Sequence, residues 1–488
     1  MALRPAVPIA IAASIAVAGC LFDVTDEEPG DAVALGVDAS DAVSPAGATY
    51  TVSSIADLRS RINAAAAGDT IIVANGSYSA SSSIAINRKG TASQPITIRA
   101  QSVGAVTITG SAGFTFGSSA AYVELRGFVF AHAAGSVSLP SGSHHCRVTR
   151  NVFRQSVPSG ASRTFLSVAG DDHEISYNTF RDKHTEGQML SVQGPGGSGM
   201  AQRTWIHHNY FLNFTDSGAN NSSALHIGHS GRSLTAAHSL VEYNLFVNTR
   251  AENEGAICNK SSDNVYRYNT LGANTQELSL RHGNRVEVYG NFFIGSEGGL
   301  RFFGDDHRIY SNYFEGCTRT ITVGNGDCTI PPGELRCHDR PDRVHVTFNT
   351  LVNNTSNLRM SGRSGGKGAT DLVIANNLIQ GGGKAAAFAG PTPGATWQGN
   401  ILWNASAGNM QGFTTLDPRL AEDSTSAYRL SESSPAIDRA VGSYSYASTD
   451  MDQQGRTGAK DVGADEVGTG PKTNRILTPA DVGPNAGL

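Results

Sequence analysis

The chain has 488 residues, of which 16% are charged and 56 are glycine, and its formal net charge is −5. The length allows two or three ordinary domains or one large β architecture, while the composition excludes a long coiled coil, a multi-span membrane protein and, with no Gly-X-Y period, collagen. The acidic balance also disfavours nucleic acid as a partner, because phosphate binding needs a basic surface.

The first 49 residues predict a leader peptide followed by an acidic tether. One base, Arg4, precedes an apolar run over residues 6–18 that is too short to cross a bilayer and that ends in Val17-Ala18-Gly19-Cys20. Small residues before a cysteine are typical of a bacterial lipoprotein signal, in which Cys20 becomes the lipidated first residue. The alternative is an ordinary signal peptide with an incidental cysteine.

We therefore expect a lipoprotein-type signal peptide over residues 1–19 and a flexible tether over residues 20–49, which hold seven acids and no base. The protein would be exported by a bacterium as an outer-membrane or cell-surface lipoprotein, or otherwise be periplasmic or secreted. Membrane contact would come only through Cys20. Residues 50–488 carry 36 bases and 35 acids, so the acidity belongs to the tether and does not exclude a polyanionic partner.

Residues 53–78 predict an N-terminal cap. Ser54 with Asp57 three residues later resembles a capping box, and Leu58 and Ile62 follow at helical spacing. A short amphipathic helix here would cover the open end of a repeat array. At the other end we expect final irregular coils, followed by a frayed tail over residues 468–488.

A short phrase repeats along the middle of the chain: an asparagine followed two residues later by an aromatic residue or leucine. The smallest spacings are 21 and 22 residues, whereas a propeller blade needs about 40. We therefore predict an all-β fold, a single-stranded right-handed parallel β-helix over residues 50–467 with a short N-terminal capping helix. Each asparagine would occupy a turn, where it tolerates left-handed backbone and bonds to the asparagine of the next coil, and the aromatics would stack inside. The repeated residues are Asn151, Asn178, Asn209, Asn244, Asn269, Asn291, Asn312, Asn349, Asn376 and Asn400.

Three of the cysteines, Cys317, Cys328 and Cys337, lie within 21 residues of each other in a stretch rich in glycine and proline. Outside the cytoplasm a disulfide among them would close a loop. No Cys-x-x-Cys pair occurs, so a structural zinc site is not expected.

The densest group of unusual polar residues runs from Glu252 to His307. Within it, Lys260 and Arg281 are 21 residues apart, and Arg281 and Arg301 are 20 apart. With coils of about 21 residues, the three cations would stack on one face of the β-helix. A column of like charges repels itself unless an anion bridges it, so the spacing predicts a groove for an acidic polymer.

These segments resemble the chondroitinase B and alginate lyase family of polysaccharide lyases, polysaccharide lyase family 6, over roughly residues 50–400. The resemblance implies β-elimination on an acidic polysaccharide, with Lys260 as general base, Arg281 as general acid, and His282 and Arg301 binding substrate. The residues that carry it are Asn259-Lys260-Ser261-Ser262, Leu280-Arg281-His282-Gly283-Asn284, Gly290-Asn291 and Gly299-Leu300-Arg301, with Ala66-Ala67-Gly68-Asp69 near the N-terminus.

The resemblance also implies a calcium ion that neutralises the uronate carboxylate. Its ligands would be Glu252 and Glu254 with Asn221 (or Asn220) from the preceding coil, because hard oxygen donors suit calcium. The sequence departs from the family here. The acidic pair stands eight and six residues before Lys260 instead of seven and five, a shift that a one-residue bulge could absorb.

Other functions fit the sequence less well. A hydrolase with paired aspartates is suggested by two segments, Gly170-Asp171-Asp172-His173 and Gly304-Asp305-Asp306-His307. The glycine of each segment stands eight residues before the next ladder asparagine, and this repetition favours a structural turn. Mannuronan epimerases share the β-helix and the substrate, but their Asp-Pro-His motif does not occur in this sequence. A surface-anchored, non-catalytic sugar-binding β-helix would keep the groove without needing Lys260 and Arg281. Within the lyases, the resemblance favours alginate over dermatan-type chondroitin.

Overall fold

The computed structural model describes residues 47–156, 161–215, 222–250, 254–273, 275–329 and 337–488. The predicted signal peptide, Cys20 and nearly all of the tether lie outside these ranges, as do Asn220, Asn221 and Glu252. Residues 46–488 form one compact unit. Within the described residues, no helix has the length and apolar character that spanning a membrane requires.

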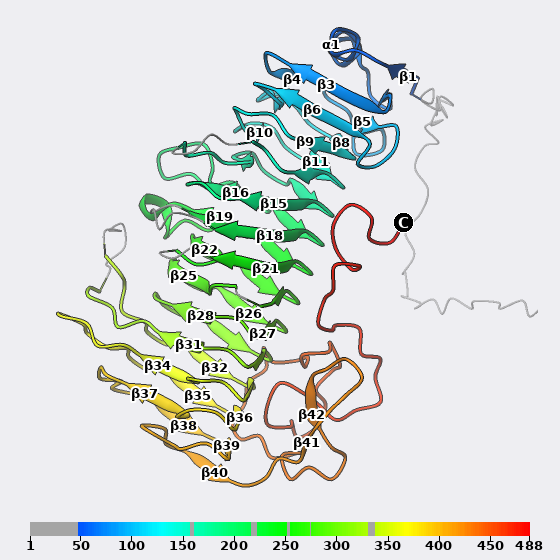
Figure 1. Cartoon of the computed structure of the whole chain (residues 1–488). Coiled ribbons are helices and arrows are strands. Elements are labelled where there is room, and N and C mark those ends of the chain that lie inside the picture. Colours follow the sequence, from blue (N-terminus) through cyan, green and yellow to red (C-terminus); the bar gives the residue numbers. More distant parts are fainter. Residues whose placement is uncertain (1–46, 157–160, 216–221, 251–253, 274, 330–336) are drawn as a thin grey trace, which may run out of the picture. The chain divides into compact units, whose positions relative to one another are not determined.

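Three long parallel sheets make up this unit, and successive coils each add one strand to each sheet (Figure 1). The predicted all-β parallel β-helix is confirmed, and its connections follow the right-handed rule for parallel strands. Inward-facing residues of all three sheets form one continuous apolar core.

Sheet A has 14 strands. They are β1 (Thr49–Val52), β2 (Thr70–Val73), β5 (Ile96–Ala100), β8 (Val123–Arg126), β11 (Arg147–Thr149), β14 (Glu174–Ser176), β17 (Trp205–His207), β20 (Leu240–Glu242), β23 (Val265–Arg267), β26 (Glu287–Tyr289), β29 (Arg308–Tyr310), β32 (His345–Thr347), β35 (Val373–Ala375) and β38 (Thr396–Gln398).

Sheet B also has 14 strands. They are β3 (Gly76–Ala80), β6 (Val106–Gly110), β9 (Phe128–Phe130), β12 (Val152–Phe153), β15 (Thr179–Lys183), β18 (Tyr210–Thr215), β21 (Leu245–Arg250), β24 (Thr270–Leu271), β27 (Phe292–Ile294), β30 (Tyr313–Glu315), β33 (Thr350–Val352), β36 (Leu378–Gln380), β39 (Asn400–Trp403) and β40 (Phe413–Thr415).

Sheet C has 12 strands and carries the candidate site. They are β4 (Ile84–Ile86), β7 (Phe114–Phe116), β10 (Val137–Leu139), β13 (Leu166–Val168), β16 (Gln188–Val192), β19 (Ser223–Gly228), β22 (Ile257–Lys260), β25 (Leu278–His282), β28 (Gly298–Phe302), β31 (Arg319–Val323), β34 (Leu358–Met360) and β37 (Ala386–Phe388). A short 3₁₀ helix, η1 (Ser230–Arg232), follows β19.

The asparagine ladder lies inside the turn between sheets A and B. In each coil the backbone N–H of the asparagine donates to Oδ1 of the next asparagine, at 2.9–3.1 Å from Asn151 to Asn400. The aromatic residues two positions later stack in the core, with ring centroids 4.6 Å apart for Phe153 and Phe180 and 4.5 Å for Phe211 and Phe246. The predicted bonds between asparagines of successive coils and the predicted stacking of aromatic residues in the core are confirmed.

Two details of the ladder differ from the prediction. The ninth ladder residue is Asn377 and not Asn376, because β33 and β36 pair in the register that places Asn377 over Asn349. The left-handed backbone belongs to the residue before each ladder asparagine, such as Tyr177 (φ 53°) and His208 (φ 52°). The asparagine side chain is thus selected for its bonds between coils and not for its backbone freedom.

The N-terminal cap is confirmed. Helix α1 (Ile55–Ala64) begins after Ser54, whose side chain accepts a hydrogen bond from the backbone N–H of Asp57 at 3.0 Å. Leu58 and Ile62 are buried against the first coil, so the helix covers the end of the apolar core.

The prediction of a frayed C-terminal tail is wrong. After the antiparallel pair β41 (Leu420–Glu422) and β42 (Tyr428–Leu430), residues 468–488 run back along the β-helix (Figure 1, red). Arg150 donates to the carbonyl oxygen of Pro484 at 2.8 Å, and the N–H of Gly483 donates to the carbonyl of His208 at 2.9 Å. Such bonds to successive coils tie the segment down, which composition alone did not indicate.

The two Gly-Asp-Asp-His segments are turns, as predicted. His307 is fully buried, its Nδ1 accepts the N–H of Val286 at 3.0 Å, and its Nε2 lies 2.8 Å from the carbonyl of Phe303. His173 accepts the N–H of Cys146 in the same way, at 3.1 Å. These imidazoles are neutral structural groups that join one coil to the next.

We expect His307 to make the fold sensitive to acid. Burial lowers the pKa of His307 to about 4, so the unfolded chain takes up a proton near pH 6.5 before the folded chain does. Stability from this group is complete above pH 6.5 and is lost as the pH falls towards 4, by up to about 3 kcal/mol. In His307→Gln, which offers a similar acceptor and donor but does not titrate, the melting temperature should fall less steeply over this range; equal slopes would contradict the assignment.

The predicted disulfide is present between Cys328 and Cys337, whereas Cys317 is buried with a free thiol.

Candidate active site

Neighbouring strands of sheet C carry the predicted catalytic and binding residues. Lys260 is the last residue of β22, Arg281 and His282 end β25, and Arg301 lies in β28. Lys260 is 4% exposed and His282 is 7% exposed, while Arg281 and Arg301 are half-buried. The structure therefore places all four residues on three consecutive coils of one sheet.

The cations do not form the straight column that their spacing predicts. Strands β22 and β25 pair residue for residue as far as Asn259, but the register then shifts, so Lys260 lies opposite His282. Arg281 is the extra residue of this β-bulge, and Arg301 lies opposite a serine of β25. Bulges re-aim side chains next to functional sites, and this one turns Arg281 out of the regular row.

Lys260 and Arg281 instead converge on the carboxylate of Glu254. Lys260 Nζ is 2.7 Å from Glu254 Oε1, and one Arg281 guanidinium nitrogen is 3.7 Å from the same oxygen. The other carboxylate oxygen, Oε2, lies 3.5 Å from Nδ1 of His226 in β19. Glu254 and His226 are each 2% exposed, so the carboxylate and the imidazole beside it are shielded from bulk water.

Glu254 is held in its ionised state. Burial alone would raise the pKa of its carboxyl group, but attraction to His226, Lys260 and Arg281 lowers this pKa below the ordinary value. Burial also lowers the pKa of His226 to about 4, so this imidazole is neutral at pH 7. The charge that keeps Glu254 ionised at neutral pH therefore comes from Lys260 and Arg281.

His282 contributes no positive charge at neutral pH. Burial, with the nearby positive groups, lowers its pKa to about 3, and its ring stacks on that of His338 with centroids 5.8 Å apart. Its Nδ1 is buried and has no hydrogen-bond partner among the described residues. His282 can thus bind a substrate oxygen through a hydrogen bond but not through an ion pair.

Arg301 is anchored by the preceding coil. Its Nε is 3.1 Å from Glu277 Oε1, and its guanidinium donates to the Ser279 hydroxyl at 3.0 and 3.2 Å. The remaining N–H groups of the planar guanidinium are suited to bind a carboxylate in a fixed orientation.

On the preceding coils of sheet C, the residues in register with His226 carry hydroxyl groups. Ser191 of β16 is the register partner of His226, and Ser167 of β13 precedes it. Arg163, Ser167 and Ser191 line a cavity of about 410 Å³. Hydroxyl groups and a guanidinium therefore lie on the same sheet as the Lys260 group, on earlier coils.

The sequence over residues 52–380 matches the family model described as chondroitinase B. The matched range contains the whole group around Glu254. This chain belongs to the chondroitinase B family.

Solved structures of family 6 lyases share the fold of this chondroitinase B family member. It is similar to the alginate lyase AlyGC (26% identity, TM-score 0.70, covering 78% of this chain and 55% of that one). It is also similar to a mannuronic acid specific family 6 lyase from human gut microbiota (24% identity, TM-score 0.66, covering 76% and 91%). A third is an alginate lyase in complex with a trisaccharide (18% identity, TM-score 0.65, covering 80% and 92%).

The chain spans about 55% of the length of AlyGC. Among curated protein sequences, none matches it.

Of the predicted calcium ligands, Glu254 lies within the described residues, whereas Asn221 (or Asn220) and Glu252 do not. Glu254 Oε2 is buried and accepts no hydrogen bond among the described residues, and the imidazole closest to it is neutral. A buried carboxylate oxygen without a donor suits a hard cation. Glu254 therefore offers calcium one oxygen ligand, whereas the groups gathered beside it, His226 and Cys258, are nitrogen and sulfur donors.

Sequence reasoning missed His226, His338 and Glu277. His226 lies 34 residues before Lys260, and His338 lies beyond a long insertion, so neither falls at the coil spacing that drew attention to the cations. Glu277 stands two residues before Ser279 in an ordinary polar stretch. The register of β19, β22, β25 and β28 brings His226 and Glu277 to the site, and His338 reaches it by stacking on His282.

Proposed function

We propose that this protein is a polysaccharide lyase that cleaves a uronate-containing polysaccharide, most simply alginate, by β-elimination to unsaturated oligosaccharides. The observation that carries the proposal is the convergence of Lys260 and Arg281 on one buried carboxylate, within the range that matches the chondroitinase B family.

In this reaction Lys260 first gives up its extra proton to solvent, and its neutral Nζ then removes the proton on C5 of the uronate. The electrons of the C5–H bond form the C4–C5 double bond, and the bond from C4 to the glycosidic oxygen breaks. Arg281 hydrogen-bonds the leaving oxygen and returns a proton to it. Because the guanidinium ordinarily holds its proton tightly, stabilising the developing negative charge is the larger part of its role.

Glu254 holds the two reacting groups together. Its Oε1 accepts from Lys260 at 2.7 Å and lies 3.7 Å from Arg281, so it fixes the separation of base and acid. His282 and Arg301 are assigned to substrate binding, the first through a neutral N–H group and the second through its guanidinium.

We assign a calcium ion to Glu254 with Glu252 and Asn221 (or Asn220). When bound, calcium supplies positive charge that neutralises the uronate carboxylate and makes the C5 proton more acidic. The support is the oxygen donor set and the unpartnered Glu254 Oε2.

Alginate is favoured over dermatan-type chondroitin because AlyGC and the trisaccharide complex are named as alginate lyases. Residues 1–19 are proposed to be a lipoprotein-type signal peptide, 20–49 a tether, and 50–467 the lyase domain, followed by the C-terminal segment 468–488. Export to the bacterial cell surface or outer membrane through a lipid on Cys20 completes this assignment.

Incubation of the purified protein with alginate should produce rising ultraviolet absorbance from the new C4–C5 double bond. The same assay on dermatan sulfate tests the second substrate. New reducing ends without this absorbance would indicate a hydrolase, and neither signal on either polymer would indicate a non-catalytic sugar-binding β-helix; both results contradict the proposal.

A further inference from the structure

A second site lies on sheet A, a different face of the β-helix from the one that carries Lys260. Trp205, the first residue of β17, is 41% exposed, which makes it one of two large aromatic residues, with Phe413, that face solvent within the described residues. The exposed part of the indole is apolar area that a ligand could cover.

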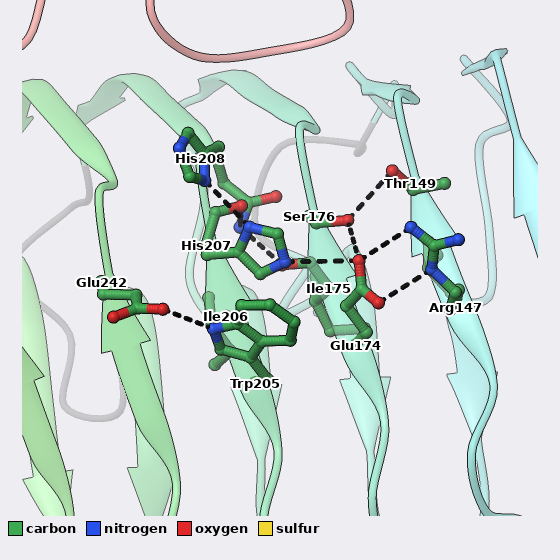
Figure 2. A network of polar contacts seen from close by, with 12 residues as sticks. Arg147, Thr149, Glu174, Ile175, Ser176, Trp205, Ile206, His207, His208 and Glu242 are labelled. Atoms are coloured by element: carbon green, nitrogen blue, oxygen red, sulfur yellow. Dashed lines mark hydrogen bonds and ion pairs between the residues drawn. The ribbon is translucent and has the colours of Figure 1, made fainter. Parts of the chain in front are cut away.

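The indole is held in one orientation (Figure 2). Its Nε1–H donates to Glu242 Oε1 at 2.9 Å, and Glu242 is in turn bound by Arg267 at 2.6 Å. The imidazole of His207 stacks on one side of the ring with centroids 3.9 Å apart. Because one face and the N–H edge are occupied by the protein, the exposed area is the apolar remainder of the ring, which is a preorganised flat platform.

Trp205 forms one end of a cavity of about 390 Å³ that extends across five coils, from that of β17 back to that of β5, where Ala92 lies. This volume falls in the range of small-ligand pockets, about 300–1,000 Å³. Strands in a sheet are about 4.8 Å apart, so the cavity runs over about 19 Å from the coil of β5 to that of β17. That length suits a short stretch of a linear chain.

The polar walls of the cavity consist of charged side chains, and each guanidinium is paired with a carboxylate of the protein. Arg147 Nε lies 2.8 Å from Glu174, as Figure 2 shows, and Arg203 binds both oxygens of Asp172 at 2.6 and 2.9 Å. With two guanidinium groups and two carboxylates, the lining has no net charge. It still offers spare N–H donors and carboxylate lone pairs, which are the partners that hydroxyl groups need.

A flat apolar platform beside paired donors and acceptors matches the chemistry of a pyranose ring, which has one C–H face and vicinal hydroxyl groups. We propose that the cavity between Ala92 and Trp205 binds pyranose units of a polysaccharide, with the Trp205 indole as the stacking platform. Since Lys260 and Arg281 lie on sheet C, this site holds a glycan chain away from the catalytic group. Alginate and a neutral glucan share the required chemistry, and the test separates them.

The test uses the fluorescence of Trp205 itself. The chain has three tryptophans, so Trp397→Phe and Trp403→Phe leave Trp205 as the single indole, and Lys260→Ala prevents cleavage. This full-length variant is titrated with an alginate hexasaccharide and, separately, with cellohexaose. We expect a saturable change in emission with at least one of them: a change with the first identifies a uronate chain as the ligand, and with the second a neutral glucan. No change with either overturns the proposal.

Arg203→Ala in this background should raise the half-saturating concentration about tenfold, because a hydrogen-bonding guanidinium is lost from the wall. The matched control is Arg343→Ala. Arg343 binds Asp306 with the same two-pronged geometry at the same left-handed turn position, but far along the β-helix from Trp205. Equal affinities of the two variants would show that the emission change does not report on the cavity. The readout needs no lyase activity, so a failure of the proposed reaction leaves it interpretable.

Discussion

Replacing Lys260 or Arg281 by alanine is expected to lower kcat/KM on alginate by about 10³-fold or more. A positioned general base or acid typically contributes 10²–10⁴-fold, and each of these residues also supports the geometry of the other through Glu254. Because the two act as a unit, the double variant should be little worse than either single variant. Initial rates of ultraviolet absorbance at several substrate concentrations measure all three.

The control is Arg285→Ala. Arg285 lies four residues after Arg281 and pairs with Asp263 at the surface, so its loss should leave turnover unchanged. Far-ultraviolet circular dichroism and melting temperatures should show that all variants are folded. A small primary amine added to Lys260→Ala should restore part of the activity if the lost group is a base. Near-normal turnover in Lys260→Ala or in Arg281→Ala would contradict the assignment.

The fold could be predicted from the sequence because its main determinants repeat. An asparagine every coil, followed two residues later by an aromatic residue, specifies a turn and a core position at once, and stacking the coils satisfies both. The C-terminal segment could not be predicted in this way. Its contacts, such as Arg150 with Pro484, join residues more than 300 positions apart and follow no period.

The site was predicted in part. The one-coil separation of Lys260 and Arg281 indicated that they are neighbours, and the structure brings them to one carboxylate. The same spacing wrongly predicted that Arg281 and Arg301 continue a straight column above Lys260. A bulge in β25 shifts the register by one residue, and the spacing of the cations along the chain does not reveal it. Burial, which makes His226 and His282 neutral, depends on neighbours from three coils and was likewise beyond a pattern along one chain.

The second large effect is expected from Glu254→Gln, which should lower kcat/KM by about 10²-fold. The substitution keeps the size of the side chain but removes the charge, so Lys260 and Arg281 face each other across a buried neutral group. Their repulsion should disturb the separation of base and acid. Glu287→Gln, which weakens a surface ion pair with Arg308, is the matched control and should retain full activity.

A chelator distinguishes the two roles proposed for Glu254. If its unpartnered Oε2 is a calcium ligand, thorough chelation should lower wild-type activity, added calcium should restore it, and Glu254→Gln should show little further loss. If wild-type activity survives chelation while Glu254→Gln remains impaired, calcium is removed from the mechanism and the ion pair with Lys260 accounts for the effect. Near-normal activity of Glu254→Gln would contradict both roles, because a carboxylate enclosed by two catalytic cations cannot lose its charge without altering them.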